Sequence, residues 1–325
     1  MMEDADGFTR LLSGAFEGSV KELSMCPGRM HADEVDTNVH LVRRLLATQF
    51  PRWADLPLEP VDSAGTVHAI YRLGEGMAVR LPRVHGGVES LEKEHRWLPI
   101  LAPLLPLVIP VPLGMGMPAE GYPWPWSVYR WLEGETATLD RIGDPREAAA
   151  DLARFVAALQ QIDPTGGPRP AGDRGVPLAE RDAPTRTAIT ALHGVLDTEA
   201  LTAAWDAALR APAWDGFPVW IHGDLLPGNL LVTRGRVSAV IDFGVAGVGD
   251  PACDLIVAWS LLSGESRDVF RSALPVDEAT WGRGRGWALS IALIALPYYV
   301  DTNPAFAQIA RYTIDEVLAD QHRGA

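Results

Sequence analysis

Residues 220–244 constrain this chain more than any other segment, because they place polar side chains at both ends of a predicted β-hairpin. Two short runs rich in Val, Leu and Ile, residues 230–232 and 237–241, flank a short turn that contains a glycine. A turn of this kind between two such runs favours antiparallel pairing. The hairpin then returns Asp242, which follows the second run, to the side of Asn229, which precedes the first.

The polar residues of this segment match the spacing of a phosphotransferase site. Residues 222–225 with Asn229 follow the kinase pattern H-x-D-L with a later Asn, and residues 242–244 supply the D-F-G that should follow it. In a kinase the loop Asp accepts the hydroxyl proton, while the Asn and the D-F-G Asp bind Mg²⁺ on the nucleoside triphosphate. Asp224 is therefore predicted as the catalytic base, and Asn229 and Asp242 as metal ligands. Either tripeptide alone is more typical of an ordinary turn beside a buried strand, but both in this order favour the site.

Two further features favour a small molecule as the phosphate acceptor. Gly223 stands where protein kinases usually carry Arg, and residues 249–255 read G-D-P-A-C-D-L. Protein kinases have an activation loop and A-P-E at that place, and this chain has neither. Through these motifs the sequence resembles the aminoglycoside phosphotransferase family, relatives of choline kinase that share the protein-kinase fold and include macrolide phosphotransferases. Within the family's G-D-P-x-x-D-L pattern, Asp254 is expected to brace the catalytic loop, and His222 is expected to fix that loop by hydrogen bonding.

The resemblance implies an α+β, bilobal, protein-kinase-like fold, with a small N-terminal antiparallel β-sheet lobe and a larger, mainly helical C-terminal lobe. We expect a nucleotide-binding lobe with its hinge at residues 30–132 and a catalytic and acceptor-binding lobe at residues 133–325. Residues 1–29 do not join the pattern and are expected to be an N-terminal extension: a disordered tail, a short accessory helix, or a stretch upstream of a second plausible start at Met30. The resemblance also implies ATP or GTP as the phosphate donor and Mg²⁺ as the cofactor.

The N-terminal part contains a predicted phosphate-binding turn, residues 62–66, between two β-rich runs. The backbone N–H groups of Ser63, Gly65 and Thr66 are expected to bind phosphate oxygens, as backbone nests do. The same short motif is also typical of an ordinary hairpin turn.

Kinases place a Lys on the third strand of this lobe, paired with a helix Glu, to hold the α and β phosphates. The only lysines of this chain are Lys21 and Lys93, and neither lies in a predicted strand. The strand position is instead taken by Arg80, which keeps the charge but has a longer, planar fork. Glu94 is its predicted helix partner, with Glu89 as the alternative.

Residues 123–134 predict a strand that ends in a glycine turn and is similar to the family's hinge. The backbone of Tyr129 and Trp131 is expected to meet the edge of the nucleobase. The preceding residues 99–117, interrupted by prolines, are expected to cross the back of the lobe without forming a membrane helix.

The remaining sequence is helical in pattern. Asp144 and Pro145 predict a capped helix start, and Asp36 is expected to begin an amphipathic helix. Residues 164–184, rich in Pro and Gly, predict a loop that acts as a lid or forms part of the acceptor site. Other helices are expected near residues 88–102, 183–194, 198–210, 250–263, 281–299 and 304–320.

Composition agrees with a two-lobe enzyme. The chain has 325 residues, of which 47% are hydrophobic, so it can bury a large core. Cys26 and Cys253 lie far apart without metal-ligating neighbours, which argues against a disulfide framework or a zinc site. The first residues lack a signal-peptide pattern, and the apolar run 287–299 is too short to span a bilayer. We therefore expect a cytoplasmic protein that does not enter a membrane.

A formal net charge of −14 argues against nucleic acid as a partner, because phosphate backbones bind basic faces. A cationic acceptor is expected instead, with acidic residues of the C-terminal lobe as candidates to line its cleft: Asp254, Glu265, Asp268, Asp301, Asp315 and Glu316. Aminoglycosides, macrolides and other hydroxylated metabolites all remain open as acceptors, and so does the oligomeric state. Because Arg80 replaces Lys, a second reading is a nucleotide-binding pseudokinase without turnover.

Overall fold

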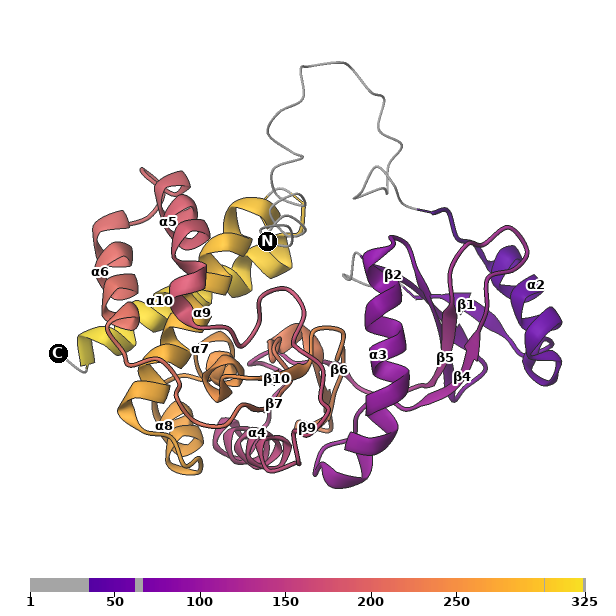
Figure 1. Ribbon diagram of the computed structural model, residues 1–325, viewed down its shortest axis with the longest axis horizontal. Coiled ribbons are helices and arrows are strands. Elements are labelled where there is room, and N and C mark those ends of the chain that lie inside the picture. Colours follow the sequence, from indigo (N-terminus) through magenta and orange to yellow (C-terminus); the bar gives the residue numbers. More distant parts are fainter. Residues whose placement is uncertain (1–34, 62–66, 301, 324–325) are drawn as a thin grey trace, which may run out of the picture.

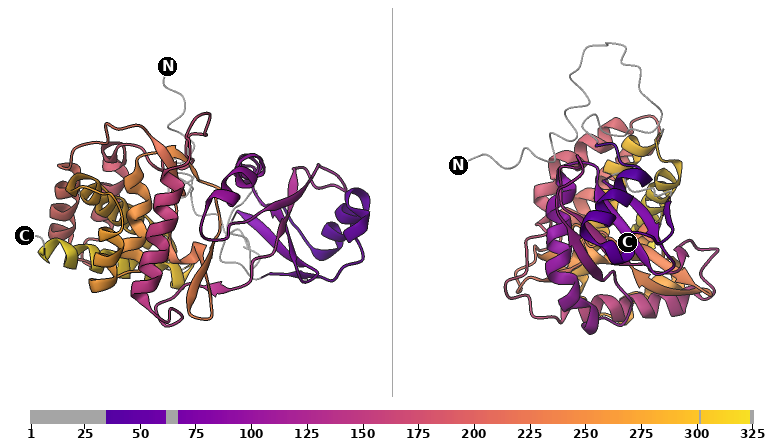
Figure 2. Two further views of the ribbon diagram at one scale, coloured as in Figure 1. Left: turned by 90° about the horizontal axis from the view of Figure 1, so that it is seen from below. Right: turned by 90° about the vertical axis from the view of Figure 1, so that its right-hand side faces the viewer.

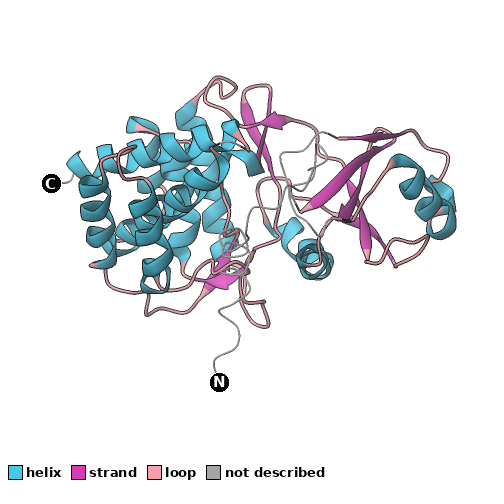
Figure 3. Cartoon of the chain, turned by 90° about the horizontal axis from the view of Figure 1, so that it is seen from above, coloured by secondary structure: helices cyan, strands magenta, loops and turns pink. Residues whose placement is uncertain are grey.

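The computed structural model describes residues 35–61, 67–300 and 302–323, which form two parts joined by a short connection. Figure 1 shows a smaller part built around a sheet and a larger part built mainly of helices. Colouring by secondary structure makes the division plain: strands dominate one half and helices the other (Figure 3). The α+β bilobal arrangement predicted from the sequence is therefore present.

The smaller part is a five-stranded antiparallel sheet with the order β1-β2-β3-β5-β4. Its strands are β1 (Leu58–Pro60), β2 (His68–Leu73), β3 (Met77–Pro82), β4 (Pro112–Gly116) and β5 (Trp126–Arg130). The alternation of buried and accessible side chains along β2 and β3 is typical of strands that bury one face. The sequence predicted β-rich runs on both sides of residues 62–66, a strand at Arg80 and a strand within 123–134; these correspond to β1, β2, β3 and β5 and are confirmed.

Strand β4 lies within the segment that was expected only to cross the back of the lobe. Pro112 can begin this strand because β4 is at the edge of the sheet, where a missing N–H breaks no ladder. Gly116 is required for another reason: a Cβ at this position would collide with the ring of Trp126. Because of its prolines, this segment was not predicted to contain a strand, although an edge strand tolerates them.

Two helices pack on the sheet from different sides. Helix α2 (Val39–Gln49) lies on the outer side, and α3 (Gly86–Leu101) lies between the sheet and the helical part (Figure 2). The Oδ1 of Asn38 caps α2 by accepting from the N–H of Leu41 at 2.9 Å. The expected start at Asp36 was therefore wrong, because the extended backbone of Asn38 meets the geometry of an N-cap.

The larger part contains two small sheets near its junction with the smaller part. Strands β6 (Glu135–Thr136), β8 (Leu230–Thr233) and β9 (Arg236–Val240) form one antiparallel sheet, so the predicted hairpin is confirmed. Strands β7 (Val219–Ile221) and β10 (Gly247–Gly249) form the other. The residues that follow β7 and β9 carry the predicted site.

Helices make up the rest of the larger part, in good agreement with the sequence pattern. Asp144 caps the first of them, as predicted, by accepting from the N–H of Arg146 at 2.8 Å. The long helices are α4 (Pro145–Gln160), α5 (Asp182–Ala191), α6 (Thr198–Leu209), α9 (Glu278–Tyr299) and α10 (Pro304–Arg323). None of the helices in the described ranges is long and apolar enough to cross a membrane.

The segment 250–263, which was expected to be one helix, is only partly α-helical. It consists of a 3₁₀ helix, η5 (Pro251–Ile256), followed by the short α7 (Val257–Ser260). The separate helix α8 (Gly264–Ser272) was not predicted, because it begins at a glycine and is rich in polar residues. A capping box between Ser263 and Ser266 provides its start signal.

Two hydrophobic cores hold these elements. The smaller joins α2 to the sheet, and the larger fills the helical part around four fully buried tryptophans, Trp205, Trp220, Trp259 and Trp287. The last turns of α3 belong to the larger core, and the rings of Trp97 and Trp220 lie 4.9 Å apart. Helix α3 therefore links the sheet to the catalytic loop. The boundaries expected at residues 29/30 and 132/133 stay predictions.

Candidate active site

The predicted catalytic loop follows β7 directly and is held from beneath by a buried carboxylate. Asp254 accepts from the backbone N–H of His222 and of Gly223, each at 2.7 Å. Gly223 has φ +80°, a left-handed conformation that favours glycine. Burial raises the pKa of Asp254, while His222 and the two backbone donors act in the opposite direction. Asp254 thus occupies the bracing position expected of it.

His222 fixes the loop rather than facing the open site. Its Nε2–H donates to the carbonyl of Ile241 at 3.0 Å, and its Nδ1 accepts from the N–H of Asp224 at 3.2 Å. A neutral ring with the proton on Nε2 satisfies both bonds. His222 therefore ties the loop to the end of β9, one residue before Asp242.

Asp224 has both carboxylate oxygens engaged. Its Oδ2 accepts from Nδ2 of Asn229 at 2.9 Å, and its Oδ1 accepts from a guanidinium nitrogen of Arg174 at 2.9 Å. The same Asn229 nitrogen also donates to the Asp224 carbonyl at 2.8 Å. This assignment of the amide leaves the Asn229 Oδ1 available as a metal ligand. Arg174 lies in the loop that the sequence marked as a lid or acceptor segment.

The hairpin brings Asp242 to the same place. The N–H of Ile241 donates to the carbonyl of Asn229 at 2.8 Å, so the two predicted metal ligands are neighbours through the backbone. Asp242 has φ +64°, an uncommon value for a residue other than glycine, and its side chain is 52% exposed. Desolvation acts to raise its pKa, but the positive charge of Arg80 acts against it, and the pKa of Asp242 is lowered.

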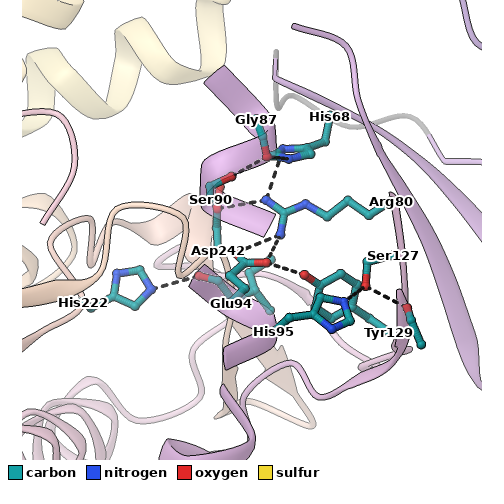
Figure 4. Close-up of polar contacts among 12 residues, drawn as sticks. His68, Arg80, Gly87, Ser90, Glu94, His95, Ser127, Tyr129, His222 and Asp242 are labelled. Carbon is teal, nitrogen blue, oxygen red and sulfur yellow. Dashed lines mark hydrogen bonds and ion pairs between the residues drawn. The ribbon is translucent and has the colours of Figure 1, made fainter. Parts of the chain in front are cut away.

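Arg80 of β3 and Glu94 of α3 form the predicted pair. One guanidinium nitrogen donates to both Glu94 oxygens, at 3.0 and 2.8 Å, and the second donates to Oδ1 of Asp242 at 3.2 Å (Figure 4). The Tyr129 hydroxyl donates to Glu94 at 2.6 Å. Although burial acts against the charge, Glu94 and Asp242 raise the pKa of Arg80 above its usual value. Glu94 rather than Glu89 is the partner.

His68 is a further member of this network that the sequence analysis missed. Its Nδ1 accepts from Arg80 at 3.2 Å, and its Nε2 donates to the carbonyl of Gly87 at 3.3 Å (Figure 4). Burial, and then the charge of Arg80, lower the pKa of His68 to about 3. The register of the β2–β3 hairpin could have indicated that His68 lies near Arg80. Ile70 is opposite Arg80, and His68 lies two residues from Ile70 on the same face of the sheet.

The expected nucleobase and phosphate contacts are placed as follows. Tyr129 lies in a central strand, and its hydroxyl donates to Glu94; the expected contact of its backbone with a nucleobase stays a prediction. The N–H of Trp131 donates to the carbonyl of Gly76 at 2.9 Å, so it is not free for a nucleobase. The predicted phosphate turn, with Ser63, Gly65 and Thr66, lies outside the described residues.

Three of the acidic residues expected to line an acceptor cleft are buried or paired with arginines. Asp254 is buried beneath the loop, Glu265 pairs with Arg146 at 2.8 Å, and Glu316 pairs with Arg267. Asp268 of α8 and Asp315 of α10 are exposed, and Asp301 lies outside the described residues. Among the described residues, the side chain that forms an ion pair with Asp224 is Arg174.

The donor set fits Mg²⁺ better than a transition metal. Asp242 and Asn229 offer two hard oxygen ligands, and Mg²⁺ in phosphate-transferring sites takes its remaining ligands from phosphates and water. Among the described residues, no group of three or more His, Cys, Asp and Glu side chains is arranged to hold a metal ion. A metal at Asp242 and Asn229 would therefore depend on the nucleotide.

Comparison with known proteins identifies related sequences. The profile of the phosphotransferase enzyme family matches residues 60–287, which is more than half of the chain. An aminoglycoside 3'-phosphotransferase of Escherichia coli is 41% identical over 58 residues, covering 18% of this chain and 21% of that protein. The uncharacterized protein YcbJ of Bacillus subtilis (strain 168) is 28% identical over 191 residues, covering 56% of this chain and 57% of that one. The matches thus span about a fifth and just over half of these relatives.

Solved structures share the fold. The GDP and kanamycin complex of APH(2")-IIia has a TM-score of 0.68 at 19% identity, covering 87% of this chain and 99% of that one. The streptomycin-ATP-APH(2")-IIa ternary complex gives 0.57 at 17%, with coverages of 86% and 99%. Macrolide 2'-phosphotransferase type I gives 0.59 at 20%, with coverages of 86% and 98%. The protein-kinase-like fold expected from the sequence is confirmed.

Proposed function

The chain belongs to the phosphotransferase enzyme family, and on this premise we propose that it transfers the γ-phosphate of ATP or GTP to a hydroxyl group of a small molecule. The observation that carries the proposal is the convergence of Asp224, Asn229 and Asp242 at the end of β7 and the β8–β9 hairpin, opposite Arg80. These are the groups that phosphoryl transfer needs: a carboxylate for the acceptor, oxygen ligands for a metal and a cation for the phosphates.

In the proposed reaction, the acceptor oxygen attacks the γ-phosphorus and its proton passes to the carboxylate of Asp224. The bond between the γ-phosphorus and the bridging oxygen breaks, and the nucleoside diphosphate leaves with the electron pair of that bond. Such a transfer requires little covalent chemistry from the protein, so positioning and charge neutralisation dominate. The contacts of Asn229 and the loop braced by Asp254 hold Asp224 in place for this step.

Asn229 Oδ1 and the Asp242 carboxylate are the residues that would hold Mg²⁺, which supplies charge neutralisation on the phosphates when bound. Arg80 is proposed to hold the α and β phosphates. Its guanidinium nitrogens lie 2.8 Å from Glu94 Oε2 and 3.2 Å from Asp242 Oδ1, so the guanidinium is next to a predicted metal ligand. A guanidinium at this position grips phosphate oxygens through parallel N–H bonds.

The alternative hypothesis of a pseudokinase was based only on the replacement of the usual lysine by Arg80. Arg80 makes the ion pair with Glu94 that a kinase lysine makes, and Asp224, Asn229 and Asp242 are all present, which supports turnover. For the acceptor, aminoglycosides, macrolides and other hydroxylated metabolites are the classes considered. Kanamycin and streptomycin occur in complexes of structurally similar proteins, but at 17–19% identity these support the fold and not the acceptor.

The test is nucleoside diphosphate release by purified protein with ATP or GTP and Mg²⁺, across a panel of hydroxylated acceptors. We expect at least one acceptor to stimulate release, with a phosphorylated product detected by mass spectrometry and no stimulation in Asp224→Asn. Thr187→Ala, on the exposed side of α5, is a matched control that should behave like the wild type. Nucleotide binding without turnover across the panel would instead favour the pseudokinase.

A further inference from the structure

Arg174 contacts the proposed base directly. It lies in the loop between α4 and η3 (Leu178–Arg181), and its guanidinium donates to Asp224 Oδ1 at 2.9 Å. Its side chain crosses the catalytic loop so closely that a Cβ on Gly223 would lie 3.2 Å from it. The Arg174 Nε is buried and has no hydrogen-bond partner. One of the donors of this guanidinium is thus unused, although it is removed from water.

Arg181 lies near Arg174 and has no carboxylate partner among the described residues. Its side chain is buried, its Nε donates to the Ser290 hydroxyl at 3.0 Å, and its guanidinium lies 4.9 Å from the centre of the Trp287 ring. Burial, and then the positive charge of Arg174, lower the pKa of Arg181 to about 10. A second guanidinium is therefore held within electrostatic reach of the first.

Such an arrangement is unfavourable by itself. A buried charge is costly to desolvate unless it is paired, and two like charges near each other add to that cost. Asp173 acts on Arg181 through its charge, and Glu180 precedes Arg181 in η3, but both of these acidic side chains are exposed. Asp224 is the only carboxylate in the described ranges that is ion-paired with Arg174, and the proposed reaction requires that carboxylate to be free.

Arg174 also lines a cavity. The cavity has a volume of about 350 Å³, and its walls include Arg169, Glu180 and Trp214. Arg169 is exposed and, like Arg174, comes from the loop that the sequence marked as part of the acceptor site. A space of this size suits a small molecule. Arg174 therefore connects a ligand-sized cavity to Asp224.

We propose that Arg174, supported by Arg181, forms an oxyanion subsite for the acceptor, so that the enzyme phosphorylates a hydroxylated molecule carrying a carboxylate or phosphate group. The inference rests on the proposed function and specifies its substrate class. It differs from the cationic acceptor expected from net charge: of the acidic residues behind that expectation, Asp254 is buried, and Glu265 and Glu316 pair with arginines. Guanidinium groups bind both kinds of oxyanion through two parallel N–H bonds.

The subsite also couples recognition to catalysis. Arg174 and Asn229 engage the two carboxylate oxygens of Asp224. An oxyanion on the acceptor competes with Asp224 for Arg174 and frees Oδ1 for the hydroxyl proton. An acceptor of the same shape without the anion leaves Oδ1 engaged, so it reacts more slowly even when it binds.

The test compares acceptors that differ only in the anion. Glucuronate is paired with glucuronamide, and glucose 6-phosphate with glucose, so that the two arms distinguish a carboxylate from a phosphate; kanamycin provides a cationic arm. Binding to the full-length protein is measured by titration calorimetry, with nucleoside diphosphate release measured in parallel. We expect at least one anion to bind tenfold or more tightly than its neutral partner, and Arg174→Gln to abolish that preference without weakening the neutral partner.

Arg186→Gln is the matched control, since Arg186 of α5 pairs with Asp182 and Asp206 at 2.8 and 2.7 Å, away from the site. It should keep the anion preference. Arg181→Lys keeps the positive charge and serves as a second variant if Arg174→Gln does not fold. It should reduce the preference for the anion less than Arg174→Gln does. The subsite is overturned if neither anion binds, if each anion binds only as tightly as its neutral partner, or if kanamycin is preferred. If acceptors of any charge are turned over in an Asp224-dependent manner, the proposed function stands even when the subsite fails.

Discussion

Replacing Arg80 by Ala should destabilise the protein as well as weaken nucleotide binding. Glu94 is only 2% exposed and Arg80 14% exposed, so removing the guanidinium leaves a buried carboxylate without its counter-charge. Breaking a buried ion pair from one side costs about 3–5 kcal/mol. The Tyr129 hydroxyl, 2.6 Å from Glu94, remains as a donor and offsets about 1 kcal/mol of that loss. The expected decrease in the free energy of unfolding is therefore about 2–4 kcal/mol.

The measurement is urea unfolding followed by tryptophan fluorescence, with the free energy obtained by linear extrapolation. Arg72→Ala is the matched control: Arg72 pairs with Glu133 at 2.7 Å, but Glu133 is 68% exposed, so the loss should stay below about 1 kcal/mol. In a Glu94→Gln background, Arg80→Ala should cost much less, because the two residues form one network. A loss below 1 kcal/mol for Arg80→Ala in the wild-type background would refute the reasoning.

Three further outcomes are expected. Asp224→Asn should lower kcat by about 10²–10⁴-fold with nucleotide affinity nearly unchanged, and wild-type turnover would remove Asp224 from the role of base. Asp242→Ala should raise the Kd for the Mg²⁺-nucleotide more than that for the acceptor, as titration calorimetry can show; equal losses would indicate a structural role. Because the pKa of His68 is lowered to about 3 from 6.5, the unfolded chain binds the extra proton between these values, and stability falls as pH drops from 7 to 4. His68→Phe should remove on the order of 2 kcal/mol of that pH dependence in urea unfolding, and an unchanged pH profile would contradict the assignment.

The sequence by itself determined the elements whose signals are local. The spacing of Asp224, Asn229 and Asp242 around a hairpin predicted their proximity, because a β-hairpin fixes which residues meet at its base. The N-cap at Asp144 and the β-rich runs that flank residues 62–66 were equally predictable, since capping and strand propensity depend on neighbouring residues. The Arg80–Glu94 pair followed from the resemblance to the kinase pattern and matches the contact in the structure.

Tertiary structure decided what depends on residues distant in sequence. Arg174 meets Asp224 across 50 residues and Arg80 meets Asp242 across 162, and no local pattern fixes either contact. The charge around the site also depends on which distant residues the fold brings together. Net charge is a sum over the whole chain, whereas an acceptor responds to the few charges within a Debye length of about 8–10 Å. Folding pairs Glu265 and Glu316 with arginines and brings Arg174 to Asp224. Composition therefore suggested a cationic acceptor, whereas the contact of Arg174 leads us to propose an anionic one.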